Sequence, residues 1–220
     1  MDENLKNTLE RIASSLEKIS REREVLHDKD HHVSNIKVSN YFVYDPAHTR
    51  LNPVQRLSCP KLSLLKGIEN VRDTLYENTK RFADGYNANN ALLWGARGMG
   101  KSTLVKSILK DLEESGTSDL KRVEIYREDI SNLPNLLNIL RASDSQFIIF
   151  CDDLSFNQPD RDFKALKSVL EGGLEGRPEN VIFYATSNRR HLLPRSMIDQ
   201  ESATGIHPNE AMDEVIALSD

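Results

Sequence analysis

The chain has 220 residues, enough for one full domain and a short additional segment. Its net charge of −5, from 29 basic and 34 acidic residues, argues against a protein that coats nucleic acid through charge alone. The sequence lacks the run of about 20 apolar residues that a membrane span needs, its start MDENLKNTLE is no signal peptide, and two cysteines make no disulfide framework. We therefore expect a cytoplasmic protein with no membrane partner.

Residues 1–26 predict an amphipathic helix. Apolar side chains recur there at steps of 4, 3, 4, 3 and 7 residues, at Leu5, Leu9, Ile12, Leu16, Ile19 and Leu26. The stripe suits a helix docked on its own domain, which we favour, and also a short coiled coil between subunits. The spacing leaves both arrangements open.

Residues 27–62 predict a connector. His, Asn and Ser are frequent in it, and Pro46, Pro53 and Pro60 interrupt any regular pattern. Within this connector, the stretch NIKVSNYFVYD is compatible with one or two short strands.

From residue 63 onward, short apolar strands alternate with helices. Helical periodicity is found between 64 and 85, at 102–114, at 134–141 and at 163–170, and strands are expected at 91–94, 123–126, 147–151 and 181–185. Short strands that are apolar throughout are typical of a parallel sheet buried under helices on both faces. We therefore predict an α/β domain with three layers, αβα.

A phosphate-binding loop is expected between the strand at 91–94 and the helix that follows. The pattern G-x-x-x-x-G-K-[ST] is matched here, and the residues expected to bind nucleotide are Gly95, Ala96, Arg97, Gly98, Met99, Gly100, Lys101, Ser102 and Thr103. The glycines let backbone N–H groups approach an anion, and the helix N-terminus adds positive potential. Lys101 would bind the β- and γ-phosphates of ATP, and Ser102 would bind Mg²⁺.

Polar residues follow two of the other strands. The strand FIIFC is followed at once by Asp152 and Asp153, which places both acids at the edge of the sheet where ligands bind. We expect Asp152 to hold Mg²⁺ and Asp153 to orient or polarise the attacking water. Asn188 follows the strand VIFYA within the sequence TSN and would reach the γ-phosphate if this strand lies between the other two; a simple polar turn is the alternative.

The order of these motifs resembles that of the AAA+ ATPases. The segments FCDDLSF, ALKSVLEGGLEGRPENV and YATSNRRHLLPR are similar to a bacterial family of ATPases of unassigned role, domain of unknown function eight hundred and fifteen, over about residues 60–220. The resemblance implies an AAA+ nucleotide-binding domain at 63–220 with the sheet order 5-1-4-3-2.

The resemblance also assigns roles to single residues. It implies that Lys101 and Ser102 belong to Walker A, that Asp152 is the Walker B acid and that Asn188 is sensor 1. With Asp153, Lys101 and Asn188 make up the expected catalytic set. Gly67 and Ile68 would lie near the adenine.

This chain departs from the AAA+ pattern in two ways. Asp153 stands where most AAA+ proteins have Glu, which is one methylene longer, so slow hydrolysis is expected. The chain ends at Asp220, where the family continues into an Arg-Phe pair, a fifth strand and a helical lid. We therefore expect a C-terminally truncated domain that lacks the fifth strand, the lid and an arginine finger, and that turns ATP over weakly.

The leading functional prediction is a Mg²⁺-dependent ATPase module that couples its nucleotide state to the remodelling or loading of an unknown protein partner. A nucleotide-dependent assembly module with little hydrolysis is the first alternative, and a small-molecule kinase is the second. A homo-oligomer is expected for the full-length protein. The basic cluster Arg189, Arg190, His191 and Arg195 favours a neighbouring subunit or a phosphate over surface ion pairs, and nucleic acid least of all.

Overall fold

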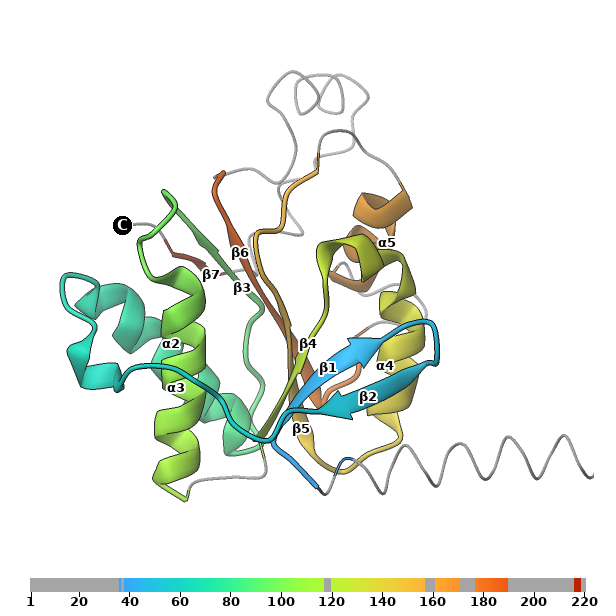
Figure 1. Cartoon of the computed structure of the whole chain (residues 1–220), viewed down its shortest axis with the longest axis horizontal. Helices are drawn as coiled ribbons and strands as arrows, with labels where there is room; N and C mark the ends of the chain where they lie inside the picture. Colours follow the sequence, from blue (N-terminus) through green and yellow to red (C-terminus); the bar gives the residue numbers. More distant parts are fainter. Residues whose placement is uncertain are drawn as a thin grey trace, which may run out of the picture.

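The chain folds into an α/β domain in which helices cover both faces of a central sheet (Figure 1). This is a computed structural model, and it describes residues 36, 38–116, 120–156, 161–170, 177–189 and 216–218. The expected helix at 1–26 lies outside these residues, as do Arg190, His191 and Arg195. The expected α/β class is confirmed. In the described part of the chain, no helix is both long enough and apolar enough to cross a membrane.

The sheet has seven strands in the order β2-β1-β4-β5-β6-β3-β7. All neighbours are parallel except β1 and β2, which form an antiparallel hairpin. The strands are β1 (Tyr41–Asp45), β2 (Arg50–Pro53), β3 (Ala91–Trp94), β4 (Leu120–Glu124), β5 (Gln146–Cys151), β6 (Val181–Ser187) and β7 (Ile216–Leu218).

The expectation that the fifth AAA+ strand is missing is wrong. Strand β7 pairs in parallel with β3, with Ile216 opposite Ala91, so that the order β7-β3-β6-β5-β4 is the expected 5-1-4-3-2. The strand escaped the sequence analysis because three residues are too few to give a strand pattern, and the fifth strand was sought after Asp220 instead.

The hairpin of β1 and β2 extends the sheet beyond β4. Phe42 of β1 lies opposite Val123 of β4, and both side chains are buried. Short strands were one expectation for this segment, but β2 lies further along the chain than the stretch that suggested them. The sequence of β2, RLNP, has little strand character, and its pairing with β1 places it at the edge of the sheet, where a proline is tolerated.

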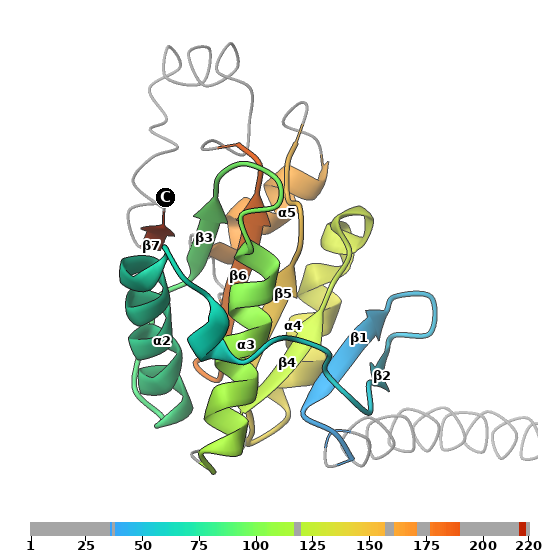
Figure 2. The same ribbon diagram turned by 60° about the vertical axis from the view of Figure 1, so that its left-hand side comes forward.

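Two layers of helices pack on the sheet (Figures 1 and 2). The apolar side chains of β5 alternate between them: Phe147 and Ile149 face one core cluster, and Ile148 and Phe150 face the other. A strand that is buried on both faces favours apolar residues at successive positions, which explains the run FIIFC. Helices α2 (Glu69–Ala83) and α3 (Lys101–Glu114), with η1 (Leu62–Leu64), cover one face; α4 (Leu133–Arg141), α5 (Arg161–Leu170) and η2 (Arg127–Asn132) cover the other.

A buried polar cluster joins α2 to the middle of β6. The hydroxyl of Tyr184 accepts a hydrogen bond from Asn78 Nδ2 at 2.9 Å and lies 2.9 Å from Thr79 Oγ1. Asn78 also donates to the carbonyl of Asn89, and Thr79 to that of Leu75. We call these three side chains, Asn78, Thr79 and Tyr184, the α2–β6 cluster. Because its members bond to one another and to nearby carbonyls, the cluster meets the general requirement that buried polar groups have partners.

Candidate nucleotide-binding site

The phosphate loop connects the end of β3 to the start of α3. Gly98 and Gly100 both have φ +82°, a conformation that side-chain-bearing residues rarely adopt. A Cβ at either position would meet nothing within 4 Å, so the need for glycine here is conformational and not steric. The loop therefore turns tightly and leads into the N-terminus of α3, where backbone N–H groups lack helical partners.

Lys101, the first residue of α3, folds back over the loop. Its ammonium group donates to the carbonyls of Gly95 at 2.9 Å and Ala96 at 2.7 Å. The same nitrogen lies 3.4 Å from Asn188 Oδ1, at the end of β6. The charge of Lys101 thus sits between the phosphate loop and the neighbouring strand.

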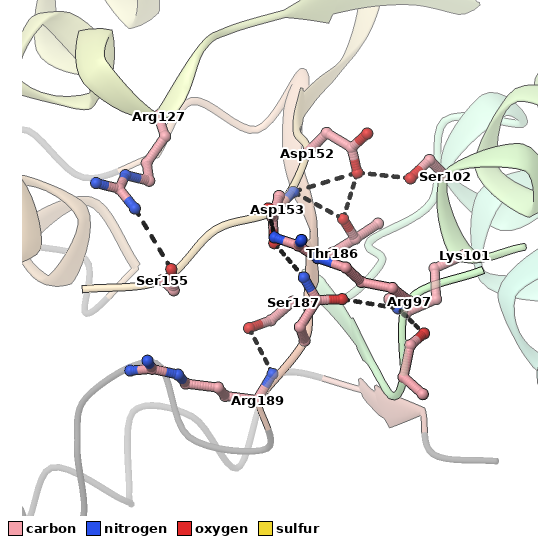
Figure 3. Close-up of polar contacts among 12 residues, drawn as sticks. Arg97, Lys101, Ser102, Arg127, Asp152, Asp153, Ser155, Thr186, Ser187 and Arg189 are labelled. Carbon is pink, nitrogen blue, oxygen red and sulfur yellow. Dashed lines mark hydrogen bonds and ion pairs between the residues drawn. The ribbon is translucent and has the colours of Figure 1, made fainter. Parts of the chain in front are cut away.

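Asp152 follows β5 and points toward the start of α3 (Figure 3). The hydroxyl of Ser102 donates to Asp152 Oδ1 at 2.6 Å, and Thr186 Oγ1 donates to the same oxygen. A hydroxyl and a carboxylate are the hard oxygen ligands that Mg²⁺ prefers. In the described part of the chain no three His, Cys, Asp or Glu residues cluster in a way that could hold a metal ion.

The carboxylate of Asp153 is turned toward the phosphate loop. The backbone of Asp153 has a φ of +51°, which is unusual for a residue other than glycine. The backbone N–H of Asp153 donates to Thr186 Oγ1 at 2.9 Å, which helps to hold this conformation. As a result, Asp153 Oδ1 accepts a hydrogen bond from Asn188 Nδ2 at 2.5 Å, and Oδ2 lies 3.4 Å from the guanidinium of Arg97.

These groups line one cavity of about 330 Å³ at the carboxyl edge of the sheet. This volume falls within the range of about 300–1,000 Å³ that is typical of small-molecule sites. The loop and α3 contribute Arg97, Gly98, Gly100, Lys101, Ser102 and Thr103, and the neighbouring strand ends contribute Asp152, Asp153, Thr186 and Asn188. The structure thus brings together the residues that the sequence analysis selected at three separate strand ends.

Some of the expected site residues do not line the cavity. Gly95 and Ala96 take part through the carbonyls that bind Lys101, and Met99 is 43% exposed. Gly67 and Ile68 precede α2 and are absent from the described lining. The backbone N–H of Gly67 bonds to Glu69 Oε1 at 3.1 Å.

Thr186 is the site residue that the sequence analysis missed. The sequence analysis placed it after the strand VIFYA, but β6 continues through Ser187, so Thr186 lies within the strand and is 2% exposed. Its hydroxyl contacts both members of the acid pair, Asp152 and the backbone N–H of Asp153. A hydroxyl residue at the carboxyl end of a buried strand, beside a strand that ends in two acids, is the signal that could have identified it.

The fold and the site together define an AAA+-like P-loop domain. Its parallel strands follow the order β7-β3-β6-β5-β4, the phosphate loop follows β3, and the acid pair follows β5. Residues 37–220 match the family described as "Protein of unknown function (DUF815)". The chain belongs to this family. No curated protein matches it.

Solved structures of AAA+ ATPases are similar to the chain in fold. The structure of DnaI is 16% identical with a TM-score of 0.53, over 82% of this chain and 97% of that one. The Orc1 protein of Aeropyrum pernix in complex with DNA is 16% identical with a TM-score of 0.49, over 71% of this chain and 45% of that one. The RuvB Holliday junction branch migration motor of Thermotoga maritima is 18% identical with a TM-score of 0.44, over 72% of this chain and 47% of that one. The chain spans about half the length of the Orc1 and RuvB structures, and at these identities the likeness to DnaI bears on the fold alone.

Proposed function

We propose that this chain is a Mg²⁺-dependent ATPase module that binds ATP at the phosphate loop. The observation that carries the proposal is the convergence on one cavity of Lys101, the Ser102–Asp152 pair and the Asp153–Asn188 pair. A loop that presents N–H groups and a lysine supplies what a polyphosphate requires. The adjacent acids supply what a metal ion and an attacking water require.

Each of these residues has a distinct role in the proposed reaction. The oxygen of a water molecule attacks the γ-phosphorus, the bond to the bridging oxygen breaks, and its electron pair stays on the ADP that leaves. Lys101 and the loop N–H groups hold the phosphates, Asn188 orients the water, and Asp153 accepts its proton. Mg²⁺ bound by Ser102 and Asp152 would supply positive charge to the phosphates when present.

We further propose that the module forms a homo-oligomer in its full-length form and couples its nucleotide state to the remodelling or loading of a protein partner. The AAA+-like architecture supports this proposal. Arg189 is exposed and directly follows Asn188, which lines the cavity, and a neighbouring subunit or a phosphate group could contact it. A nucleotide-dependent assembly module with little hydrolysis is the second candidate, and it is favoured by the engagement of both oxygens of Asp153 by Asn188 and Arg97.

Replacement of Lys101 by alanine tests the nucleotide site. We expect Lys101→Ala to weaken the binding of ATP with Mg²⁺ by about 100-fold or more in calorimetry, because each charged hydrogen bond contributes about 1.5–3 kcal/mol. Lys110→Ala is the matched control, since Lys110 lies on the same helix but pairs with Glu114 and is absent from the described cavity lining. Equal affinity of the Lys101→Ala protein and the wild type for ATP would overturn the proposal.

Steady-state turnover separates the two candidate functions. A wild-type chain that binds ATP and releases phosphate in a Lys101-dependent reaction is an ATPase. A chain that binds ATP with the same Lys101 dependence but releases no phosphate is an assembly module.

A further inference from the structure

Arg97 is a cation of the phosphate loop whose side chain faces the acid pair. Its guanidinium Nη2 lies 3.4 Å from Asp153 Oδ2, and the side chain is 82% exposed (Figure 3). An ion pair this exposed contributes little to stability, so Arg97 is not needed to hold the fold. The pair is also easily exchanged when a stronger anion enters the cavity that Arg97 lines.

The contacts of Arg97 belong to a short chain of polar contacts around the cavity. Lys101 contacts Asn188, Asn188 donates to Asp153, and Asp153 pairs with Arg97. This series of contacts begins and ends at a cation of the phosphate-loop motif, and it includes Asp153, the acid that is expected to act on water. Asp153 therefore has both carboxylate oxygens engaged in this arrangement, one by Asn188 and one by Arg97.

An ATP molecule in the loop offers Arg97 a better partner than Asp153. The terminal phosphate carries more charge than one carboxylate and presents several oxygens, and a planar guanidinium can bind two of them at once. The transition state of phosphoryl transfer spreads negative charge over those same oxygens. A cation on the loop itself can reach this charge without help from a second subunit.

We propose that Arg97 is a catalytic residue of ATP hydrolysis that acts within its own subunit. When ATP binds, the guanidinium leaves Asp153 for the γ-phosphate and stabilises the charge that develops there. The same movement frees Asp153 Oδ2 for the attacking water. This inference rests on the proposed ATPase function.

The step balances without any further reactant. The water oxygen bonds to the γ-phosphorus as the bond to the bridging oxygen breaks, and ADP keeps the electron pair. Asp153 accepts one proton from the water and returns it to the products. Arg97 gives and takes no proton, because its guanidinium stays charged throughout.

Arg127, another arginine near the acid pair, is placed differently. Arg127 Nη1 lies 3.4 Å from Ser155 Oγ, and Arg127 is absent from the described lining of the cavity. It is exposed like Arg97 and lies across the strand ends from the phosphate loop in Figure 3. Arg127→Ala is therefore a matched control, because it removes an equal charge close to the site.

The test combines turnover with two binding measurements on the full chain. We expect Arg97→Ala to lower kcat by about 100-fold or more, since removing a transition-state arginine costs about 10³–10⁵ in related phosphoryl transfers. Its affinity for a non-hydrolysable ATP analogue should fall about tenfold, while its affinity for ADP changes less than about twofold. Arg97→Lys should recover part of kcat, because lysine restores the charge but not the fork. Arg127→Ala should match the wild type in all three measurements.

Several results would overturn the inference. They are a kcat of Arg97→Ala within threefold of the wild type, a rise in kcat, or equal losses of affinity for ADP and for the analogue. A wild type that binds ATP but releases no phosphate would overturn both the ATPase function and the catalytic role of Arg97. Failure of the nucleotide site looks different, because ATP binding would then be absent or independent of Lys101. Normal turnover of both the wild type and Arg97→Ala would overturn the role of Arg97 alone.

Discussion

Strand β6 carries two polar clusters that differ in almost every physical respect. In its middle, Tyr184 is 1% exposed and bonds to Asn78 and Thr79 of α2. At its end, Thr186 and Asn188 contact the acid pair and border a cavity. The first cluster is neutral and closed, whereas the second contains two carboxylates and faces open space.

The difference separates polar groups that hold the fold from polar groups that line the proposed nucleotide site. In the α2–β6 cluster the three side chains and nearby carbonyls satisfy one another, so the cluster fixes α2 on the sheet. At the strand end the cations Lys101 and Arg97 and the carboxylates of Asp152 and Asp153 line one cavity. Charges held at a cavity wall remain available to a substrate. We therefore expect changes at the two clusters to affect different measurements.

The largest effect is expected from Asp152→Asn. The amide oxygen can still accept from Ser102 and Thr186, which keeps the local fold, but the charge that would hold Mg²⁺ is lost. Turnover of ATP should fall by about 100-fold or more, with little change in melting temperature. A coupled phosphate-release assay over a range of Mg²⁺ concentrations measures this.

Asp144→Asn provides the control for Asp152→Asn. Asp144 is exposed in the turn between α4 and β5, at the opposite end of β5 from the acid pair. Its turnover should equal that of the wild type. Unchanged turnover in Asp152→Asn would remove this residue from the metal site.

Elements with a strong local pattern could be predicted from the sequence. The run ALLW became β3 with the expected bounds, and FIIFC became β5 with one added residue. The phosphate loop was recognisable because its glycines, lysine and serine occupy fixed positions between a strand and a helix. Proximity of Asp153 to Asn188 followed from the rule that parallel strands end at one edge of a sheet.

Features that depend on tertiary context could not be predicted. Strand β4 begins at Leu120, three residues before the expected start, and the two charged residues buried in it, Lys121 and Arg122, hid this start. Buried Arg122 stacks over the ring of Phe150 at 4.3 Å and pairs with Glu124, contacts that no local pattern announces. Strand β7 pairs with a strand more than a hundred residues earlier in the chain, and the contact between Arg97 and Asp153 joins two separate loops.

A smaller effect, confined to stability, is expected from Tyr184→Phe. The change removes the hydroxyl, but Asn78 keeps its bond to Asn89 and Thr79 keeps its bond to Leu75. The free energy of unfolding should fall by about 1 kcal/mol, the usual contribution of one hydrogen bond. Urea unfolding measures this loss, and calorimetry should show ATP affinity equal to that of the wild type. A change in ATP affinity of more than threefold would mean that the two clusters are coupled along β6.

The smallest effect is expected from the titration of the same tyrosine. Burial raises the pKa of Tyr184 from 10.0 to about 12, and its hydrogen bonds to Thr79 and Asn78 offset part of this rise. Above pH 10 the unfolded chain loses the phenol proton of Tyr184, whereas the folded chain keeps it until about pH 12. Between these pH values the unfolded state therefore binds fewer protons than the folded state. The stability that this group contributes is therefore complete below pH 10 and is lost as the pH rises toward 12. At pH 10.5 the loss of stability is less than about 1 kcal/mol.

Urea unfolding at pH 8 and pH 10.5 measures this loss. The fall in the free energy of unfolding between the two pH values should be smaller for Tyr184→Phe than for the wild type. It should not be zero, because burial also raises the pKa of Tyr41. Equal losses in both proteins would show that Tyr184 titrates alike in the folded and unfolded chains, and would contradict a closed, dry α2–β6 cluster.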